Sequence, residues 1–273
     1  PPHVAPAVGE LLTRDTTRRA LGQHFLRDAG IARAIVDLLA PTPHDLVVEI
    51  GPGEGALTGE LARRAGRVVA LEVDRALVER LRRRLPGVEV LEADARAWDY
   101  GTLRRPAGGR VLVAGNLPYS VSKPIVAALL DARNAIDVLA LMLQREVAER
   151  LAAPPGGKVY GALSVLTQAV CDVELALRVP PGAFRPPPQV ESAVVRLTPL
   201  ARGRVPPGLE ARFREVVRAA FAQRRKTLAN ALAAGLGVSL GAVRQAATTS
   251  GVDPGRRAET LTIEDFVSLA GRL

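Results

Sequence analysis

The chain has 273 residues, of which 48% are hydrophobic, so it is long enough to bury a sizeable core and we expect a globular protein. No apolar run approaches the roughly 20 residues that are needed to cross a bilayer, and the opening PPHVAPAVGE lacks the charged and apolar regions of a signal peptide. We therefore expect a cytoplasmic protein with no membrane partner. The net charge of +9 favours a polyanionic partner.

Helical and strand-like segments alternate from residue 28 onward, where Asp28 is placed to cap the first helix. Short, continuously apolar strands that are separated by helices are typical of a parallel sheet covered on both faces. The sequence therefore predicts an α/β fold. Its expected strands are 46–50, 67–73, 88–92, 110–116 and 137–143, its further helices are 56–65, 74–85, one after 122, 144–151 and 160–169, and two late strands are 171–179 and 190–197.

A proline- and glycine-rich stretch, LTPLARGRVPPGL (197–209), predicts a domain boundary. Beyond it the apolar spacing is only helical, and Ser239 and Thr262 are placed to cap two of the helices. We expect a catalytic domain over residues 1–200 and a small helical domain over residues 201–273. The second domain has 12 basic and 6 acidic side chains, a net charge of +6, whereas the first has 25 and 22, a net charge of +3.

The first strand ends in a glycine-rich loop, Glu49-Ile-Gly-Pro-Gly-Glu-Gly55, that precedes a helix. Glycines such as Gly51 and Gly53 allow a tight turn and let a ligand approach the main chain. Taken alone this loop is a modest signal, because ordinary strand-to-helix turns also use glycine.

Two acidic residues follow the next two strands. Glu72 ends the second strand and Asp94 follows the third, so both are expected beside the crevice at the carboxyl ends of the sheet. A carboxylate at position 72 can accept hydrogen bonds from both ribose hydroxyls, and a carboxylate at position 94 can accept a hydrogen bond from an adenine amine. A surface residue and a helix cap are the alternatives for Glu72 and Asp94.

The fourth strand delivers Asn116, Leu117, Pro118 and Tyr119 beside the same crevice. An adenine N6 amine is a poor nucleophile, because its lone pair is delocalised into the ring. An Asn oxygen and a neighbouring main-chain carbonyl can accept both N6 hydrogens, and Tyr119 offers a face for a flipped base. A surface turn is the alternative for these four residues. The histidines at 3, 24 and 44 are scattered, and we expect no metal.

Nine motifs in order carry a resemblance to a known family: LGQHFLRD (21–28), VVEIGPGEGALT (47–58), LEVD (71–74), EADA (92–95), NLPYSVSKP (116–124), LQREVAERL (143–151), YGALSV (160–165), PPGAFRPPPQVESAVVRL (180–197) and FAQRRKTLANAL (221–232). They cover nearly the whole chain, which resembles the ribosomal RNA adenine N6,N6-dimethyltransferase family, in particular its bacterial small-subunit (16S) members.

The resemblance implies a Rossmann-like, class I S-adenosylmethionine-dependent methyltransferase with a mostly parallel seven-stranded sheet. It places the segment with His24 and Leu26 over the methionine part of the cofactor. The same resemblance assigns Gly51 and Gly53 to the glycine loop, Glu72 to the ribose, Asp94 to the adenine, and Asn116 to cofactor binding and catalysis. Phe184 is expected to flank the target adenine opposite Tyr119.

The implied activity is the dimethylation of two adjacent adenines in small-subunit rRNA during ribosome maturation, on a 30S-like assembly particle and by a monomer. We expect Arg218, Arg224, Arg225 and Lys226 to contact rRNA phosphates, whereas the alternative for each is a solvated helix face.

Two residues depart from the family pattern: His24 stands where Asn is usual, and Ser120 follows the motif tyrosine where Asn is usual. Both changes put cofactor affinity in question.

Three alternatives stay open at this point. They are a large-subunit rRNA adenine methyltransferase of the antibiotic-resistance type, a non-catalytic ribosome assembly factor, and, most distantly, an NAD-dependent dehydrogenase.

Overall fold

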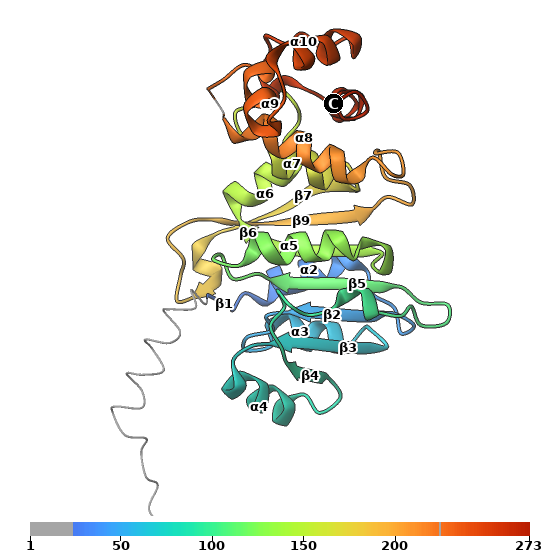
Figure 1. Cartoon of the computed structure of the whole chain (residues 1–273). Coiled ribbons are helices and arrows are strands. Elements are labelled where there is room, and N and C mark those ends of the chain that lie inside the picture. Colours follow the sequence, from blue (N-terminus) through green and yellow to red (C-terminus); the bar gives the residue numbers. More distant parts are fainter. Residues whose placement is uncertain (1–23, 224) are drawn as a thin grey trace, which may run out of the picture. The chain divides into compact units, whose positions relative to one another are not determined.

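The computed structural model of the chain describes residues 24–223 and 225–273 (Figure 1). The expected cofactor-covering segment before residue 24, and the predicted RNA contact Arg224, lie outside the described residues. Two compact units make up the fold: the first runs to Arg145 and includes Ala176–Val194, and the second consists of Glu146–Leu175 and Val195–Leu273.

A seven-stranded sheet has the strand order β4-β3-β2-β5-β6-β9-β7. Strand β2 is parallel to β3 and β5, and the further pairs β3·β4 and β5·β6 are also parallel. The strands are β2 (Leu46–Ile50), β3 (Arg67–Glu72), β4 (Glu89–Glu92), β5 (Val111–Asn116), β6 (Val138–Gln144), β7 (Cys171–Val179) and β9 (Ser192–Pro199). The predicted mostly parallel sheet is therefore confirmed, and both late strands lie together at one edge.

The chain order reverses direction across the sheet between β2 and β5. Strands β3 and β4 are added on one side of β2, whereas β5 and β6 are added on the other. Such a topological switch point leaves a crevice at the carboxyl ends of the central strands. Ile50 pairs with Gly115 and with Leu71 in the register of these strands, so the glycine loop and the residues after β3 and β5 emerge side by side.

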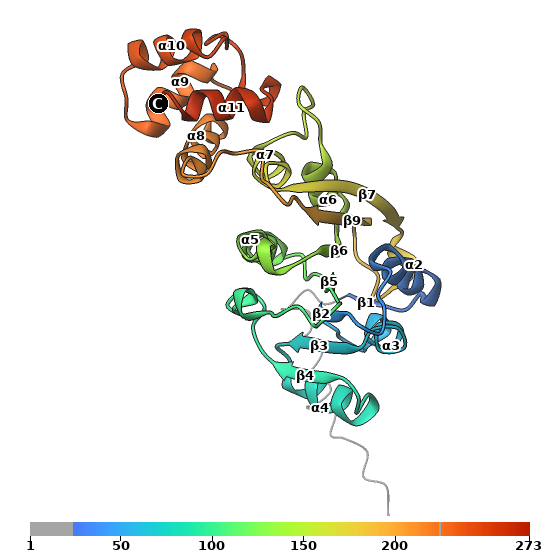
Figure 2. The same ribbon diagram turned by 90° about the vertical axis from the view of Figure 1, so that its right-hand side faces the viewer.

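Helices cover both faces of the sheet in the first unit. Figure 2 shows α5 (Ser122–Asp131) on one face, and α2 (Ala29–Leu39) and α3 (Ala56–Ala62) on the other. The apolar sides of α2, α3 and α4 (Arg75–Arg84) pack with the sheet in a single core that includes Ile35, Leu61 and Val78. The predicted cap is confirmed, since the Asp28 side chain accepts a hydrogen bond from the Ile31 amide.

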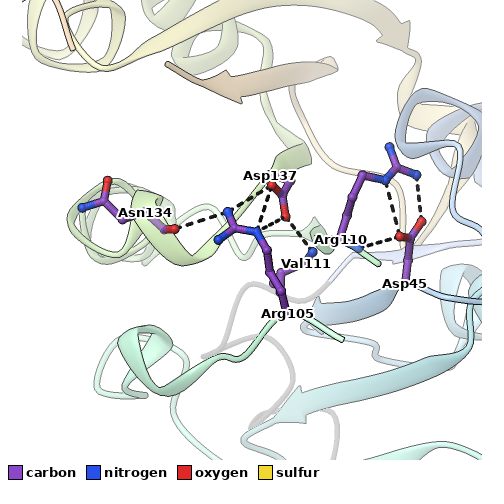
Figure 3. Close-up of polar contacts among 6 residues, drawn as sticks. All are labelled: Asp45, Arg105, Arg110, Val111, Asn134 and Asp137. Atoms are coloured by element: carbon purple, nitrogen blue, oxygen red, sulfur yellow. Dashed lines mark hydrogen bonds and ion pairs between the residues drawn. The ribbon is translucent and has the colours of Figure 1, made fainter. Parts of the chain in front are cut away.

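Two carboxylates, the buried Asp45 and the half-buried Asp137, connect the amino ends of the strands (Figure 3). Asp45 accepts hydrogen bonds from the main-chain amide and the guanidinium of Arg110, and Asp137 accepts from Arg105 and from the Val111 amide. These contacts lie at the opposite end of the strands from the crevice, so they stabilise the sheet without occupying the site.

A two-stranded sheet joins the start of the described chain to a later segment of the same unit. Strand β1 (Phe25–Leu26) is antiparallel to β8 (Phe184–Arg185). This pairing fixes the segment that contains His24 against the segment that precedes β9.

The second unit has its own hydrophobic core. Its helices are α6 (Arg145–Ala152), α7 (Ala162–Gln168), α8 (Glu210–Ala222), α9 (Leu228–Leu236), α10 (Leu240–Thr249) and α11 (Ile263–Ala270). Tyr160 and Val165 share this core with Phe213 and Phe266, so the segment of α6 and α7 packs with the C-terminal helices. The predicted Ser239 cap and the Thr262 capping box are both confirmed. The functional division at residue 200 stays a prediction.

Among the described residues, no helix is long and apolar enough to cross a membrane.

Candidate active site

A cavity of about 210 Å³ opens at the carboxyl ends of β2, β3 and β5. Among the described residues, all those that line it belong to the first unit. Of the predicted site residues it brings together His24, Gly51, Gly53, Glu72, Asp94, Asn116, Leu117, Pro118 and Tyr119. The crevice that was predicted from the strand ends is therefore present, and it gathers residues from five separate segments of the chain.

The glycine loop follows β2 with its backbone in the left-handed region. Gly51 has a φ of 65° and Gly53 a φ of 55°, conformations that glycine adopts without strain. A Cβ atom at Gly53 would lie 2.8 Å from the Phe25 ring, which is too close for any side chain. Only glycine therefore fits this turn, and the main chain of the loop is left accessible along the cavity wall.

Glu72 ends β3 with a carboxylate that is 4% exposed and held by main-chain amides. One of its oxygens accepts hydrogen bonds from Val73 and Asp74 at 2.9 and 3.0 Å, and the other accepts from Gly53 at 3.2 Å. Burial raises the pKa of Glu72, and the amides of Asp74, Gly53 and Val73 oppose that rise. Because a carboxylate can accept about four hydrogen bonds, Glu72 keeps a position for a ligand hydroxyl.

Asp94 follows β4 and lines the cavity, but its carboxylate already has a partner. The Arg96 guanidinium donates to both oxygens, at 3.0 and 2.6 Å, and the Arg96 main-chain amide donates at 2.8 Å. These bonds from Arg96 lower the pKa of Asp94, so the group is ionised at neutral pH. The alternative of a helix cap is not found, because residues 95–97 form a turn and no helix begins directly after Asp94. Arg96 is exposed and lines the same cavity, so it forms part of this wall.

Asn116 ends β5 with its amide oriented by the main chain of another element. Its Nδ2 donates to the His24 carbonyl at 2.9 Å. A carbonyl can bond only to the NH₂ end of an amide, so this contact decides which end is free. Within the described part of the chain, Oδ1 has no hydrogen-bond partner, and it is the acceptor available to a ligand amine. The bond uses the backbone of His24, so the unusual side chain at that position does not disturb it.

Tyr119 is the aromatic wall of the cavity, half-buried and held from two sides. Its hydroxyl lies 2.6 Å from the Ser192 hydroxyl, and its ring centroid lies 5.6 Å from that of His24 at an interplanar angle of 35°. The His24 ring is itself fixed, because its Nδ1 lies 2.9 Å from the Pro186 carbonyl oxygen. Burial raises the pKa of Tyr119, so the phenol stays neutral.

Two predicted site residues lie outside this cavity. Phe184 is 4% exposed and packs in the core of the first unit, so its ring offers no free face for an adenine. Leu26 is also a core residue, 5% exposed, and it lines a neighbouring cavity of about 20 Å³ that it shares with residues of the glycine loop. The structure places His24, rather than Phe184, beside the Tyr119 ring.

Sequence reasoning missed three residues in or beside the site: Glu49, Ser192 and Arg96. Glu49 is 1% exposed, and its Oε2 has no hydrogen-bond partner among the described residues. Burial, with the charge of Glu72 as a smaller contribution, raises the pKa of Glu49 to about 8. Ser192 and Arg96 were also missed. A glutamate inside the apolar strand LVVEI was the available signal for Glu49, whereas the other two contacts depend on tertiary structure.

The predicted RNA contacts that the structure describes lie in the second unit. Arg218 is exposed on α8, and Arg225 and Lys226 are exposed in the turn between α8 and α9. Within residues 24–223 and 225–273, none of the three is ion-paired to an acidic side chain. They are therefore available to an anionic partner.

Comparison with known proteins shows which family and which relatives the chain is similar to. The family model for ribosomal RNA adenine dimethylase matches residues 14–273. The chain is 46% identical to the ribosomal RNA small subunit methyltransferase A of Geobacter metallireducens, over 93% of this chain and 94% of the relative. It is 47% identical to the protein of the same name from Geobacter sulfurreducens, over 92% and 93%.

Two solved structures share the fold over nine-tenths of the chain. The 23S rRNA methyltransferase ErmE matches with a TM-score of 0.69 at 29% identity, over 91% of this chain and 99% of that chain. A dimethyladenosine transferase from Plasmodium falciparum matches with a TM-score of 0.75 at 25% identity, over 90% and 96%. The likeness extends over both compact units.

Proposed function

Since the chain belongs to the ribosomal RNA adenine dimethylase family, we propose that it transfers methyl groups from S-adenosylmethionine to adenine N6 amines in small-subunit (16S) rRNA. Two adjacent adenines, each methylated twice, are the proposed target, on a 30S-like assembly particle. The chain acts as a monomer in the cytoplasm, where ribosomes assemble.

The residues around the cavity fit the cofactor. Gly51 and Gly53 supply main chain where a side chain would block approach, and Glu72 presents a buried carboxylate to ribose hydroxyls. Asp94 would accept a hydrogen bond from the adenine amine of the cofactor if Arg96 released one of its hydrogen bonds to the carboxylate. The Arg96 side chain is exposed, so it is free to move away. When bound, S-adenosylmethionine supplies a methyl group made electrophilic by its sulfonium centre.

The oriented amide of Asn116 is the observation that carries the proposal. Its Nδ2 is bound to the His24 carbonyl, and Oδ1 is left to accept a hydrogen bond from the target N6 amine. Acceptance by Oδ1 and by a neighbouring main-chain carbonyl holds the amine in a pyramidal geometry and aims its lone pair along one direction. Tyr119 stacks on the base that is turned out of the RNA. A preoriented acceptor of this kind acts by positioning and electrostatics.

The large-subunit alternative is not favoured. Identity to the small-subunit relatives is 46–47%, whereas identity to the 23S rRNA methyltransferase ErmE is 29%. A non-catalytic assembly factor has no need for Glu72, Asp94 and Asn116 around one cavity, and all three are there. A dehydrogenase leaves the Asn116–Tyr119 turn without a role.

The proposed function is tested by supplying methyl-labelled donor with small-subunit particles, free 16S rRNA and free 23S rRNA, each isolated without adenine N6 methylation. The expected result is labelled N6,N6-dimethyladenine in a 16S fragment by mass spectrometry, most efficiently in the particles. Label in 23S rRNA alone would establish the large-subunit alternative. Donor binding in a thermal-shift titration without any transfer would establish the assembly-factor alternative.

A further inference from the structure

Tyr119 lies on a short turn between β5 and α5, where its side chain has little regular structure to restrain it. A tyrosine ring rotates about two side-chain bonds, and a stacking platform is useful only if its plane is fixed before the base arrives. The contacts that fix the plane of the Tyr119 ring are therefore expected to affect base stacking as well as the packing of the fold.

The hydroxyl of Tyr119 is anchored by one buried residue. Ser192 is fully buried, and its Oγ lies 2.6 Å from the tyrosine oxygen, the shorter end of the range for such a bond. Ser192 begins β9, and the next three residues of the strand, 193–195, are buried and apolar. A lone buried hydroxyl among apolar neighbours needs a partner, and the Tyr119 hydroxyl supplies it.

The segment that leads to Ser192 is fixed at both ends to the same site. At its start Arg185 pairs with Phe25 in the two-stranded sheet, and the Pro186 carbonyl lies against the His24 ring. At its end Ser192 binds Tyr119, whose ring lies beside His24. These contacts connect His24, the segment 185–192 and Tyr119 to one another. The position of the Tyr119 phenol is therefore fixed relative to the His24 carbonyl that orients Asn116.

We propose that Ser192 is a positioning residue for methyl transfer, because its hydroxyl holds the Tyr119 phenol and thereby fixes the plane on which the target adenine stacks. This inference rests on the proposed function, since it assigns a partner to the proposed stacking residue. Ser192 itself does not line the cavity and touches neither donor nor base.

A double-mutant cycle tests the proposal through the single-turnover rate of methyl transfer to small-subunit particles. Ser192→Ala and Tyr119→Phe each remove one partner of the bond and keep the tyrosine-like ring. Each is expected to lower the rate about three- to tenfold, the range of one net hydrogen bond. The double variant is expected to be no slower than either single variant. Donor affinity in calorimetry is expected to be unchanged in all three.

Ser164→Ala is the matched control. Ser164 is also fully buried and hydrogen-bonded, to the Gly161 amide and the Arg150 carbonyl, but it lies in the second unit. This variant is expected to lose stability and keep the transfer rate of the wild type, so a fall in rate that merely follows lost stability would be recognised.

Three outcomes would overturn the proposal: a wild-type rate in Ser192→Ala, a wild-type rate in Tyr119→Phe, or multiplicative effects in the double variant. If Ser192→Ala fails to fold, Tyr119→Phe still tests the bond from its other side. Failure of the proposed function is distinct, because then the wild-type protein itself transfers no methyl group to small-subunit rRNA.

Discussion

At the residue scale, Glu72 links the glycine loop to the end of β3 and offers its remaining acceptor position to the cofactor. We predict that Glu72→Ala lowers S-adenosylmethionine affinity by about 10- to 100-fold, since hydrogen bonds to a charged group are lost and water replaces them only in part. Calorimetry with the free cofactor measures this effect.

The control for this prediction is Glu79→Ala, which removes an exposed glutamate from α4. Its cofactor affinity is expected to equal that of the wild type, and RNA affinity is expected to be unchanged in both variants. Unaltered cofactor binding by Glu72→Ala would remove Glu72 from the cofactor site.

Glu49 makes the stability of the protein depend on pH. Its pKa is raised from the ordinary value of 4.5 to about 8 in the folded chain, so the folded state holds a proton that the unfolded state releases. Stability from this group is fully present below pH 4.5 and falls as pH rises toward 8. We predict that Glu49→Gln gains stability relative to the wild type between pH 5 and pH 8.

Urea unfolding of both proteins at several pH values in that interval measures the difference. A difference in unfolding free energy that does not change with pH would show that Glu49 is ionised in the folded state.

The sequence predicts cofactor-site residues best where a strand end fixes the direction of a side chain. Glu72, Asp94 and Asn116 were predicted from their places directly after strands, and all three line the cavity. Phe184 and Ser192 were beyond such reasoning, because the path of the segment between β8 and β9 decides which side chain reaches Tyr119. Their roles depend on long-range contacts that local spacing does not encode.

At the element scale, the amino ends of β2 and β5 are joined through Asp45 and Arg110. Burial alone would raise the pKa of Asp45, but the bonds from Arg110 and Thr42 outweigh it and lower the value to about 2. This stabilisation is present above the ordinary pKa of 3.8 and is lost as pH falls toward 2. We predict that Asp45→Ala lowers the unfolding free energy by about 2–3 kcal/mol at neutral pH.

The comparison for Asp45→Ala is Asp172→Ala, which breaks the exposed pair between Asp172 and Arg204. An exposed ion pair contributes about 0–1 kcal/mol, so this variant is expected to resemble the wild type in urea unfolding. Equal losses of unfolding free energy in the two variants would show that the buried contacts of Asp45 stabilise the protein no more than an exposed ion pair does.

The elements themselves were largely predictable, because apolar periodicity and capping residues are local signals. Asp28, Ser239 and Thr262 each mark a helix start that the structure confirms. The end of α8 was left open, because FAQRRKTLANAL keeps helical spacing throughout. The structure ends α8 at Ala222 and starts α9 at Leu228. The placement of α6 and α7 in the second unit rests on tertiary contacts, such as those of Tyr160, that no local pattern reveals.

At the scale of the whole molecule, the positive charge is concentrated in residues 201–273, which carry a net charge of +6. We predict that replacing Arg218 and Arg225 together by Ala weakens binding to small-subunit particles and reduces the slope of log affinity against log salt by about 1 to 2, since each phosphate contact releases counterions. Cofactor affinity is expected to stay the same. Filter binding at several salt concentrations measures the slope.

Exposed arginines elsewhere supply the control for this charge effect. Replacing Arg63 and Arg75, exposed on the first unit, removes the same charge and is expected to change the slope less. Wild-type affinity and slope in the Arg218/Arg225 double variant would show that these two arginines are only solvated, and recognition of the particle would then fall to the first unit.

The central claim is that the Asn116 amide, oriented by the His24 carbonyl, aims an adenine N6 amine at the methyl donor. Single-turnover transfer to small-subunit particles, with mass spectrometry of the rRNA fragments, tests this claim most directly. The wild type is expected to yield N6,N6-dimethyladenine. Asn116→Ala is expected to bind particles normally and to transfer on the order of 10²-fold more slowly, the size of effect seen when one preoriented polar group is removed from an active site. Comparable rates in the two proteins, or a methyl group on any atom other than adenine N6, would contradict it.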